Sequence, residues 1–290
     1  MKILQFIGSC VIVMNRRNEK QELLVQKRRE DDFSNHLQAE VLNNRLLNEV
    51  IKMHQETCWI SEIMFEYDKN LLEWMGLVEF TDIIPDYYEK SFQFSVEPDF
   101  VERSRSCRTF VNDWSIEMDD FGEILRDSFG RFSNTLSKNY PSAGGLYPIL
   151  PLVYIFNKNV LKGVDIKGCY LFNSTQFELI LLKEYSEQSI EEVKKQINPT
   201  DSFLFSNIAI GYAIDLKRAI TKYRKRGYRY ALIEVGAMCQ SFRESISKFN
   251  NLGDFCFAGF NDNALTYLSG LNPRLAPVAL IQWFGEKNDV

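Results

Sequence analysis

The stretch Pro141–Pro148, PSAGGLYP, places a serine and two glycines between two prolines, just before the apolar run Leu152–Phe156. Glycines allow a ligand to approach the backbone closely, and prolines restrict the freedom of a loop. The apolar run predicts a buried strand. A rigid loop that opens onto such a strand can present backbone amides to a flat, heteroatom-rich ligand. Taken alone, the stretch fits a tight turn between two elements equally well.

The composition is that of a globular protein with one large or two modest domains: 290 residues, 45% hydrophobic and 25% charged. A net charge of -5 argues against nucleic-acid binding, which needs an excess of Lys and Arg. No apolar segment reaches the ~18 residues that a membrane helix needs. The six cysteines form no C-x-x-C pair, a usage typical of a reducing cytoplasm. We expect a cytoplasmic protein without nucleic-acid or membrane partners.

Histidine is scarce, because His36 and His54 are the only two in the chain. This argues against Ser-His-Asp hydrolysis, Cys-His proteolysis and His-rich zinc catalysis. The sequence also lacks a GxGxxG motif after a strand and a GxxxxGK[ST] motif, so nicotinamide Rossmann and P-loop folds have no support. We expect no metal site, and an organic cofactor that carries the difficult chemistry.

Periodicity predicts the secondary structure in outline. The longest expected helix is Tyr228–Phe249, about 33 Å at ~1.5 Å per residue. Other helices are expected over residues 36–58, after a cap at Ser115 and from a capping box at Ser189. Strands are expected over residues 3–14, 20–28, 152–156, 168–173, 177–183, 206–214 and 277–284. We divide the chain into residues 1–95, an N-terminal region for partner or peptide contact, and residues 96–290.

Three further clusters carry polar chemistry. The segment Arg103–Arg108 holds three arginines and two serines, which suit a phosphate, although a solvated basic turn is an alternative. In Lys222–Tyr230, basic and aromatic residues alternate. This pattern fits single-stranded nucleic acid, a solvated approach to the long helix, or a Lys-Tyr acid/base pair. Phe257–Asp262 sets small residues between aromatics, which suits a stacked planar ring or an ordinary loop.

Together these motifs resemble a known family. The pattern Arg105-Ser106-x-Arg108-x-Phe110, PSAGGLYP, the segment 222–236, Ala258-Gly259-Phe260 and the tail 276–285 are similar to the flavin-dependent nitroreductase-like oxidoreductases. Among these the chain resembles the SagB-type azoline dehydrogenases over about residues 100–290. The resemblance implies an α+β nitroreductase-like fold, with a central antiparallel or mixed sheet, flanking helices and a long central helix. A small α/β region would precede it.

The resemblance also implies FMN, a homodimer with the flavin near the subunit interface, and a role in bacteriocin biosynthesis. The reaction would oxidise thiazolines or oxazolines to azoles in a ribosomally made precursor peptide, beside cyclodehydratase subunits. The implied catalytic residues are Lys222 and Tyr223. The implied cofactor residues are Arg105, Ser106 and Arg108 at the phosphate, Pro141, Ser142, Ala143, Gly144 and Gly145 at the isoalloxazine, and Ala258 and Gly259. In relatives a basic residue often stands just ahead of PSAG, but here Asn139 and Tyr140 displace Lys138.

The chemistry of such a reaction agrees with these residues. Aromatising an azoline removes a hydride from one ring carbon and a proton from its neighbour. A flavin can take the hydride, and Lys222 is the candidate base if Arg224, Lys225 and desolvation favour its neutral form, with Tyr223 orienting or relaying. Two alternatives remain open: an FMN nitro or quinone reductase acting on small molecules, or a non-catalytic binding subunit of a modification complex.

Overall fold

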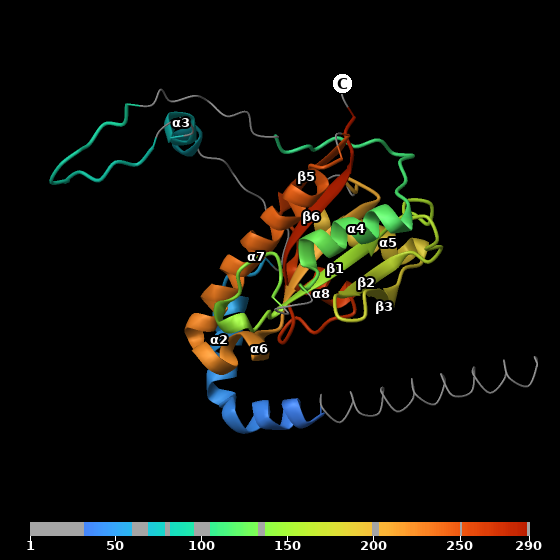
Figure 1. The fold of residues 1–290 in the computed structure, drawn as a ribbon, viewed down its shortest axis with the longest axis horizontal. Helices are drawn as coiled ribbons and strands as arrows, with labels where there is room; N and C mark the ends of the chain where they lie inside the picture. The colour runs from blue at the N-terminus through green and yellow to red at the C-terminus, as the bar shows by residue number, and fades with distance from the viewer. Residues whose placement is uncertain are drawn as a thin grey trace, which may run out of the picture.

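A computed structural model describes residues 32–59, 69–78, 82–95, 105–132, 137–198, 203–249 and 251–288. Its centre is a six-stranded antiparallel sheet of order β3-β2-β1-β4-β6-β5 (Figure 1). The strands are β1 Ile149–Ile155, β2 Gly168–Asn173, β3 Glu178–Glu184, β4 Ile208–Ile214, β5 Leu252–Phe257 and β6 Val278–Glu286. The helices are α2 Asn44–Gln55, α3 Lys69–Val78, α4 Met118–Phe129, α5 Glu187–Ile197, α6 Leu216–Tyr223, α7 Lys225–Ile246 and α8 Asp262–Leu268, with the 3-10 turn η1 Ala143–Gly145.

Both faces of the sheet are buried, and successive side chains of one strand enter opposite layers. Val153 and Ile155 of β1 pack in the layer of α4 and α7, while Leu152 and Tyr154 pack in the layer of α5 and α8. This alternation is the period of two expected for a strand. Helices therefore cover the two faces of an antiparallel sheet. The predicted α+β arrangement, a central antiparallel sheet with flanking helices and one long helix, is confirmed.

The central helix α7 crosses one face of the sheet and contacts α4, α6 and β5. It begins and ends three residues earlier than predicted. Arg224 sets its start, because a φ of 55° at this residue breaks the helical path between α6 and α7. The predicted approach to the long helix is thus the end of a separate helix, α6.

Several local predictions were wrong in their boundaries. The helix predicted over residues 36–58 is two helices, because Asn43 caps α2 by accepting a hydrogen bond from the backbone of Arg45. Ser115 does not cap α4, since the next residue, Ile116, forms a bridge to Leu161. The cap of α5 is Ser186 and not Ser189, whose backbone N–H donates to the Ser186 hydroxyl. The strands predicted over residues 3–14 and 20–28 lie outside the described residues.

The described N-terminal residues behave in two ways. Leu47, Val50 and Ile51 of α2 join the core that α7 covers, so this helix packs with the sheet domain. Helix α3 has no buried residue, and it lies away from the sheet in Figure 1. The division near residue 95 stays a prediction. Among the described residues, no helix is both long and apolar enough to cross a membrane.

Candidate functional site

The loop that joins α4 to β1 is held in an unusual backbone conformation. Gly144 and Gly145 have φ values of 63° and 66°, which suit glycine, and Tyr147 has a φ of 48°, which is strained for a residue with a side chain. The backbone N–H of Tyr147 donates to the Ser142 hydroxyl oxygen at 2.9 Å. Arg218 of α6 donates from Nε to the carbonyl oxygen of Leu146. The loop is therefore tied both to itself and to α6.

Lys222 and Tyr223 lie against this loop. A Cβ atom at Gly144 would lie 2.6 Å from the hydroxyl oxygen of Tyr223 and 2.9 Å from Nζ of Lys222. The φ of 63° favours glycine at this position, and a larger side chain would have to displace the ends of Lys222 and Tyr223. A Cβ at Gly227 would collide with the carbonyl oxygen of Ala219, so that glycine lets the first turn of α7 pack on α6. The fold thus joins two motifs that are about 80 residues apart in sequence.

The surroundings of the pair differ from the expectation in one respect. Lys222 is exposed and Tyr223 is half-buried in the single chain. The Nζ of Lys222 lies 5.2 Å from the centroid of the Tyr223 ring, which also meets the ring of Tyr230 edge-on. The desolvation expected for Lys222 is therefore not supplied by the described residues.

Two buried ionisable groups lie beneath the loop, and sequence reasoning assigned neither of them to the site. Glu234 of α7 is 3% exposed, and burial raises its pKa to about 7 against smaller opposing effects of the nearby Ser142, Lys138 and Arg218. Lys138 is 9% exposed, and burial lowers its pKa to about 8. Its Nζ lies over the rings of Tyr140 and Tyr147 at 5.6 and 5.5 Å. Lys138 therefore packs against the tyrosines on both sides of the Ser142–Gly145 segment.

A second site collects the arginine cluster. Arg105, Ser106 and Arg108 line a cavity of about 700 Å³ together with Arg243 and Lys287. The segment lies on β5, since Cys107 donates its backbone N–H to the carbonyl of Asp254. Three guanidiniums, an ammonium and a hydroxyl form a donor set that fits a phosphate monoester. The predicted phosphate residues are brought together here, and Arg243 and Lys287 join them.

The one carboxylate of this cavity is already engaged. Asp254 is 4% exposed and accepts from Nε and Nη2 of Arg243 at 2.9 and 2.8 Å. It also accepts from Nε2 of Gln282, whose Oε1 accepts from the buried Tyr212 hydroxyl. This network ties the cavity to the core of the sheet. It fixes the Arg243 guanidinium and neutralises the acid that would repel an anion.

Ala258 and Gly259 directly follow β5, at the end opposite to Gly253 and Asp254, which line the arginine cavity. Ala258 is exposed, and Gly259 lies against the ring of Phe257. One strand thus connects the arginine cavity to the predicted ring-binding segment, so one elongated ligand along β5 could contact both.

The arginine cavity and the Ser142–Gly145 loop lie at different ends of α7. Ile246 and Ser247 line the cavity, whereas the loop places Ser142 near Glu234 and Gly144 against the residues just before Lys225. Figure 1 shows η1 beside the first half of α7 and the start of the green segment, residues 105–110, near its last turns. Glu234 and Ser247 are separated by about 20 Å along the helix at ~1.5 Å per residue.

The fold brings His54 closer to this region than the sequence indicated. Its Nδ1 lies 2.9 Å from the Tyr228 hydroxyl, and its Nε2 lies 3.3 Å from Sγ of Cys58. Burial lowers the pKa of His54 and raises that of Cys58 to about 12. Both groups are therefore neutral at pH 7. They act as a polar contact between α2 and α7, and the imidazole is engaged away from the loop.

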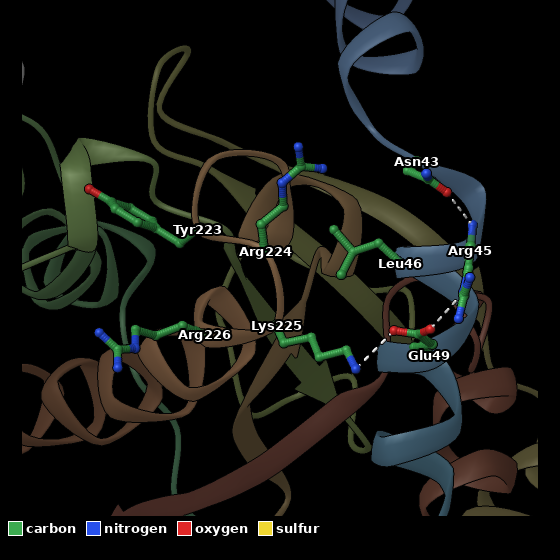
Figure 2. Close-up of a pocket in the computed structure, with 8 residues that line it drawn as sticks. All are labelled: Asn43, Arg45, Leu46, Glu49, Tyr223, Arg224, Lys225 and Arg226. Atoms are coloured by element: carbon green, nitrogen blue, oxygen red, sulfur yellow. Dashed lines mark hydrogen bonds and ion pairs between the residues drawn. The ribbon is translucent and has the colours of Figure 1, made fainter.

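A pocket of about 620 Å³ lies on the other side of Tyr223, between α2 and the α6–α7 junction (Figure 2). Lys225 and Arg45 both contact Glu49, while Arg224 and Arg226 extend from the strained junction. The lining is strongly basic in a chain of net charge -5. In the part of the chain that the structure describes, no group of three or more His, Cys, Asp or Glu residues could hold a metal ion.

Comparison with known proteins agrees with this geometry. Residues 101–281 match the Nitroreductase family, so the chain belongs to that family. The predicted membership in a nitroreductase-like superfamily is confirmed.

Within the family, a curated relative is the microcin B17-processing protein McbC of Escherichia coli, 27% identical over 157 residues. That match spans 53% of this chain and 56% of the relative. The E. coli microcin synthetase McbBCD complex with truncated pro-MccB17 bound gives a TM-score of 0.73 at 22% identity, over 87% of this chain and 97% of the matched chain. A nitroreductase-type structure from Ralstonia eutropha gives 0.52 at 16% identity, over 67% and 89%. Residues 222–229 and 276–285 of the sequence had also indicated a likeness to the dehydrogenase subunit of the microcin B synthetase, and these matches confirm it.

Proposed function

We propose that this protein is an FMN-dependent azoline dehydrogenase that oxidises thiazolines or oxazolines of a precursor peptide to thiazoles or oxazoles. The observation that carries the proposal is the contact of Lys222 and Tyr223 with Gly144. A reductase of small molecules needs a flavin loop but has no evident need for an ammonium and a phenol against it. The likeness to McbC, a microcin-processing protein, supports a peptide substrate.

The residues that would bind the cofactor lie in two separate parts of the molecule, the arginine cavity and the Ser142–Gly145 loop, which we call half-sites. Arg105, Ser106 and Arg108 would hold the FMN phosphate, with Arg243 and Lys287 as further donors in the same cavity. Ala258 and Gly259 would lie beside the ring system, since they continue the strand that leaves the cavity. The exposed backbone of the loop Pro141, Ser142, Ala143, Gly144 and Gly145 would cover the ring. FMN, when bound, accepts the hydride that leaves one carbon of the azoline.

The chain itself handles the proton. Nζ of Lys222 would take it from the neighbouring ring carbon, and the Tyr223 hydroxyl would orient the substrate or relay the proton. The exposed position of Lys222 requires that substrate and a second subunit cover it, because a neutral amine is favoured only after desolvation. The two lost hydrogens are thus accounted for as one hydride and one proton.

A homodimer explains why the half-sites are separated along α7. One subunit would supply the arginine cavity, and the other would supply the loop with Lys222 and Tyr223. Leu232 and Ile233 on the first half of α7 are 44% and 63% exposed, and they would pack in such an interface.

The N-terminal helix α2 lines the pocket of Figure 2, and we infer that this pocket contacts the peptide while other N-terminal residues contact the partner subunits. Arg224 and Arg226 in the pocket of Figure 2 would bind the peptide next to the reacting ring. Replacing Arg226 by alanine should weaken peptide binding a few-fold, mainly at low salt, while the exposed control variant Lys158→Ala should not. Equal peptide affinities of the two variants in fluorescence anisotropy would exclude this pocket as a peptide-binding site.

The exposed α3 is a candidate surface for cyclodehydratase subunits.

The direct experiment combines spectroscopy with mass spectrometry. The purified protein should be yellow, and denaturation should release FMN, since the cavity suits one phosphate monoester and the sequence has no dinucleotide motif. Supplied with a cyclised precursor peptide, it should remove two hydrogens per azoline ring. Bound FMN with NAD(P)H-dependent reduction of nitro compounds or quinones but no azole formation would favour the reductase alternative. A protein that takes up no flavin would favour a binding subunit.

A further inference from the structure

The end of α2 is bonded to the start of α8, and the chemistry proposed above makes no use of this contact. Nε2 of Gln55 donates to Oδ1 of Asn263 at 3.0 Å, and Nδ2 of Asn263 donates back to Oε1 of Gln55 at 2.9 Å. Beside this amide pair, the backbone N–H of Trp59 donates to Oδ2 of Asp262 at 2.8 Å, and the backbone N–H of Asp262 donates to the carbonyl oxygen of Trp59 at 3.1 Å. All four residues are half-buried, so these hydrogen bonds are partly shielded from water.

Helix α2 is a firm support for this contact. Val50 and Ile51 pack in the core that α7 covers. His54, the residue just before Gln55, is buried with its Nδ1 2.9 Å from the hydroxyl oxygen of Tyr228 on α7. The end of α2 is therefore fixed on the sheet domain, and α8 is attached to a fixed point.

The start of α8 also bounds the segment predicted to lie beside the flavin ring. Ala258 and Gly259 make no backbone hydrogen bond outside the strand ladder in the part of the chain that the structure describes. Their position is therefore set by what flanks them. Phe257 pairs in β5 on one side, and on the other side the buried ring of Phe260 and the first residue of α8, Asp262, hold the chain.

We propose that Gln55 and Asn263 are positioning residues of the flavin site: their amide pair fixes the start of α8 and with it the segment Ala258–Gly259. The inference rests on the proposed function, which assigns this segment to the flavin ring. Neither amide touches flavin or substrate, and both act through the backbone that leads into α8. The N-terminal region thus contributes to the flavin site in addition to its proposed contacts with peptide and partners.

The test measures the affinity of the full chain, after removal of bound flavin, for FMN and for riboflavin, which has the same ring and lacks the phosphate. Gln55→Ala and Asn263→Ala should each weaken both ligands by the same factor, on the order of fivefold, because the ring-binding segment loosens while the arginine cavity stays intact. The double alanine variant should be no worse than either single variant, since both changes remove the same pair. Gln55→Glu keeps an acceptor for Asn263 and should lose less affinity than Gln55→Ala.

Two control variants separate positioning from stability. Gln176→Ala removes an exposed glutamine from the turn between β2 and β3 and should leave both affinities unchanged. Val160→Ala opens a cavity at a side chain that is 1% exposed, so it should lower the melting temperature and leave riboflavin affinity unchanged. Melting temperatures identify any variant that does not fold, and Gln55→Glu keeps the test open if an alanine variant is lost.

The outcomes distinguish this inference from the proposed function. A parent protein that binds neither ligand would contradict the proposed flavin site, and the inference with it. If the parent binds both ligands, alanine variants at Gln55 and Asn263 that melt at a lower temperature but bind riboflavin like the parent would overturn the positioning role alone. A loss of affinity for FMN without a loss for riboflavin would also overturn it, because the effect would then lie at the phosphate.

Discussion

The two ends of α7 carry two different kinds of site. At its C-terminal end, arginines and a lysine line an open cavity, and the one acid there is saturated by Arg243 and Gln282. Toward its N-terminal end, a strained glycine loop rests on buried Glu234 and Lys138 and faces Lys222 and Tyr223. The first is suited to holding an anion, and the second to holding a ring and moving a proton.

The separation of these sites has a functional consequence. Binding energy from the phosphate and chemistry at the ring would come from different subunits, so a monomer would hold two incomplete half-sites. Variants at the C-terminal end of α7 should therefore lose flavin affinity, and variants near its N-terminal end should lose turnover.

The largest effect is expected at the reactive end. Lys222→Ala should keep its FMN and lose azoline oxidation by about 10²–10⁴-fold, the range of a well-placed acid/base group. Tyr223→Phe keeps the ring and loses the hydroxyl, so its loss should be smaller. Mass spectrometry of a cyclised peptide measures the reaction, and flavin absorbance measures the loading. A flavin-loaded Lys222→Ala protein that forms azoles at the parent rate would exclude the proposed base.

A smaller effect is expected at the anion-binding end. Arg108→Ala removes one charged hydrogen bond, of about 1.5–3 kcal/mol, so FMN affinity should fall on the order of tenfold to a hundredfold. Riboflavin affinity should not change, because riboflavin has no phosphate. Equal losses of affinity for FMN and riboflavin, measured by fluorescence titration, would mean that the FMN phosphate does not bind in the arginine cavity.

The pH dependence of stability separates the two ends further. Burial raises the pKa of Glu234 to about 7, above its ordinary 4.5, so the fold favours the protonated form. The stability that this proton contributes is fully present below about pH 4.5 and is lost as the pH rises through 7. Glu234→Gln mimics the protonated form. It should match the parent near pH 4.5 and exceed it at pH 8 by on the order of 1–3 kcal/mol.

Thermal unfolding of both proteins at each pH measures this difference, and Glu244→Gln provides an exposed control. A gap between Glu234→Gln and the parent that is the same at pH 5 and pH 8 would mean that the Glu234 carboxyl is not titrating in this range.

The sequence predicted the parts of the molecule in which local pattern and tertiary structure agree. Strands β1, β4 and β6 are runs of β-branched and aromatic residues, and α7 has a long apolar period. Strand β5 was missed, because LGDFCF contains a glycine and an acid that are weak strand formers. Asp254 is tolerated there because Arg243 and Gln282 satisfy it, and these residues are distant in sequence.

The residues of the candidate site also fall into those that the local sequence pattern predicts and those that only the fold reveals. Contiguous motifs such as the Arg105–Arg108 cluster could be recognised from their composition alone. Helix α6 was not predicted as a separate helix, because its end at Arg224 depends on a positive φ that the residue type alone does not predict. One signal for Glu234 was available: it falls between Ala231, Val235 and Met238 on the apolar face of α7, where a charged residue must be buried. Its position beneath the Ser142–Gly145 loop could only be found from the fold.

The most direct test of the central claim, one active site built from two subunits, is complementation between inactive variants. Co-expression with two affinity tags yields a heterodimer of Arg105→Ala/Arg108→Ala with Lys222→Ala. In this heterodimer one site carries every defect, and the other pairs an intact arginine cavity with an intact Lys222. We expect about half of the parent azoline oxidation per dimer, although each variant homodimer is inactive. A heterodimer as inactive as its parents would contradict an active site shared between two subunits.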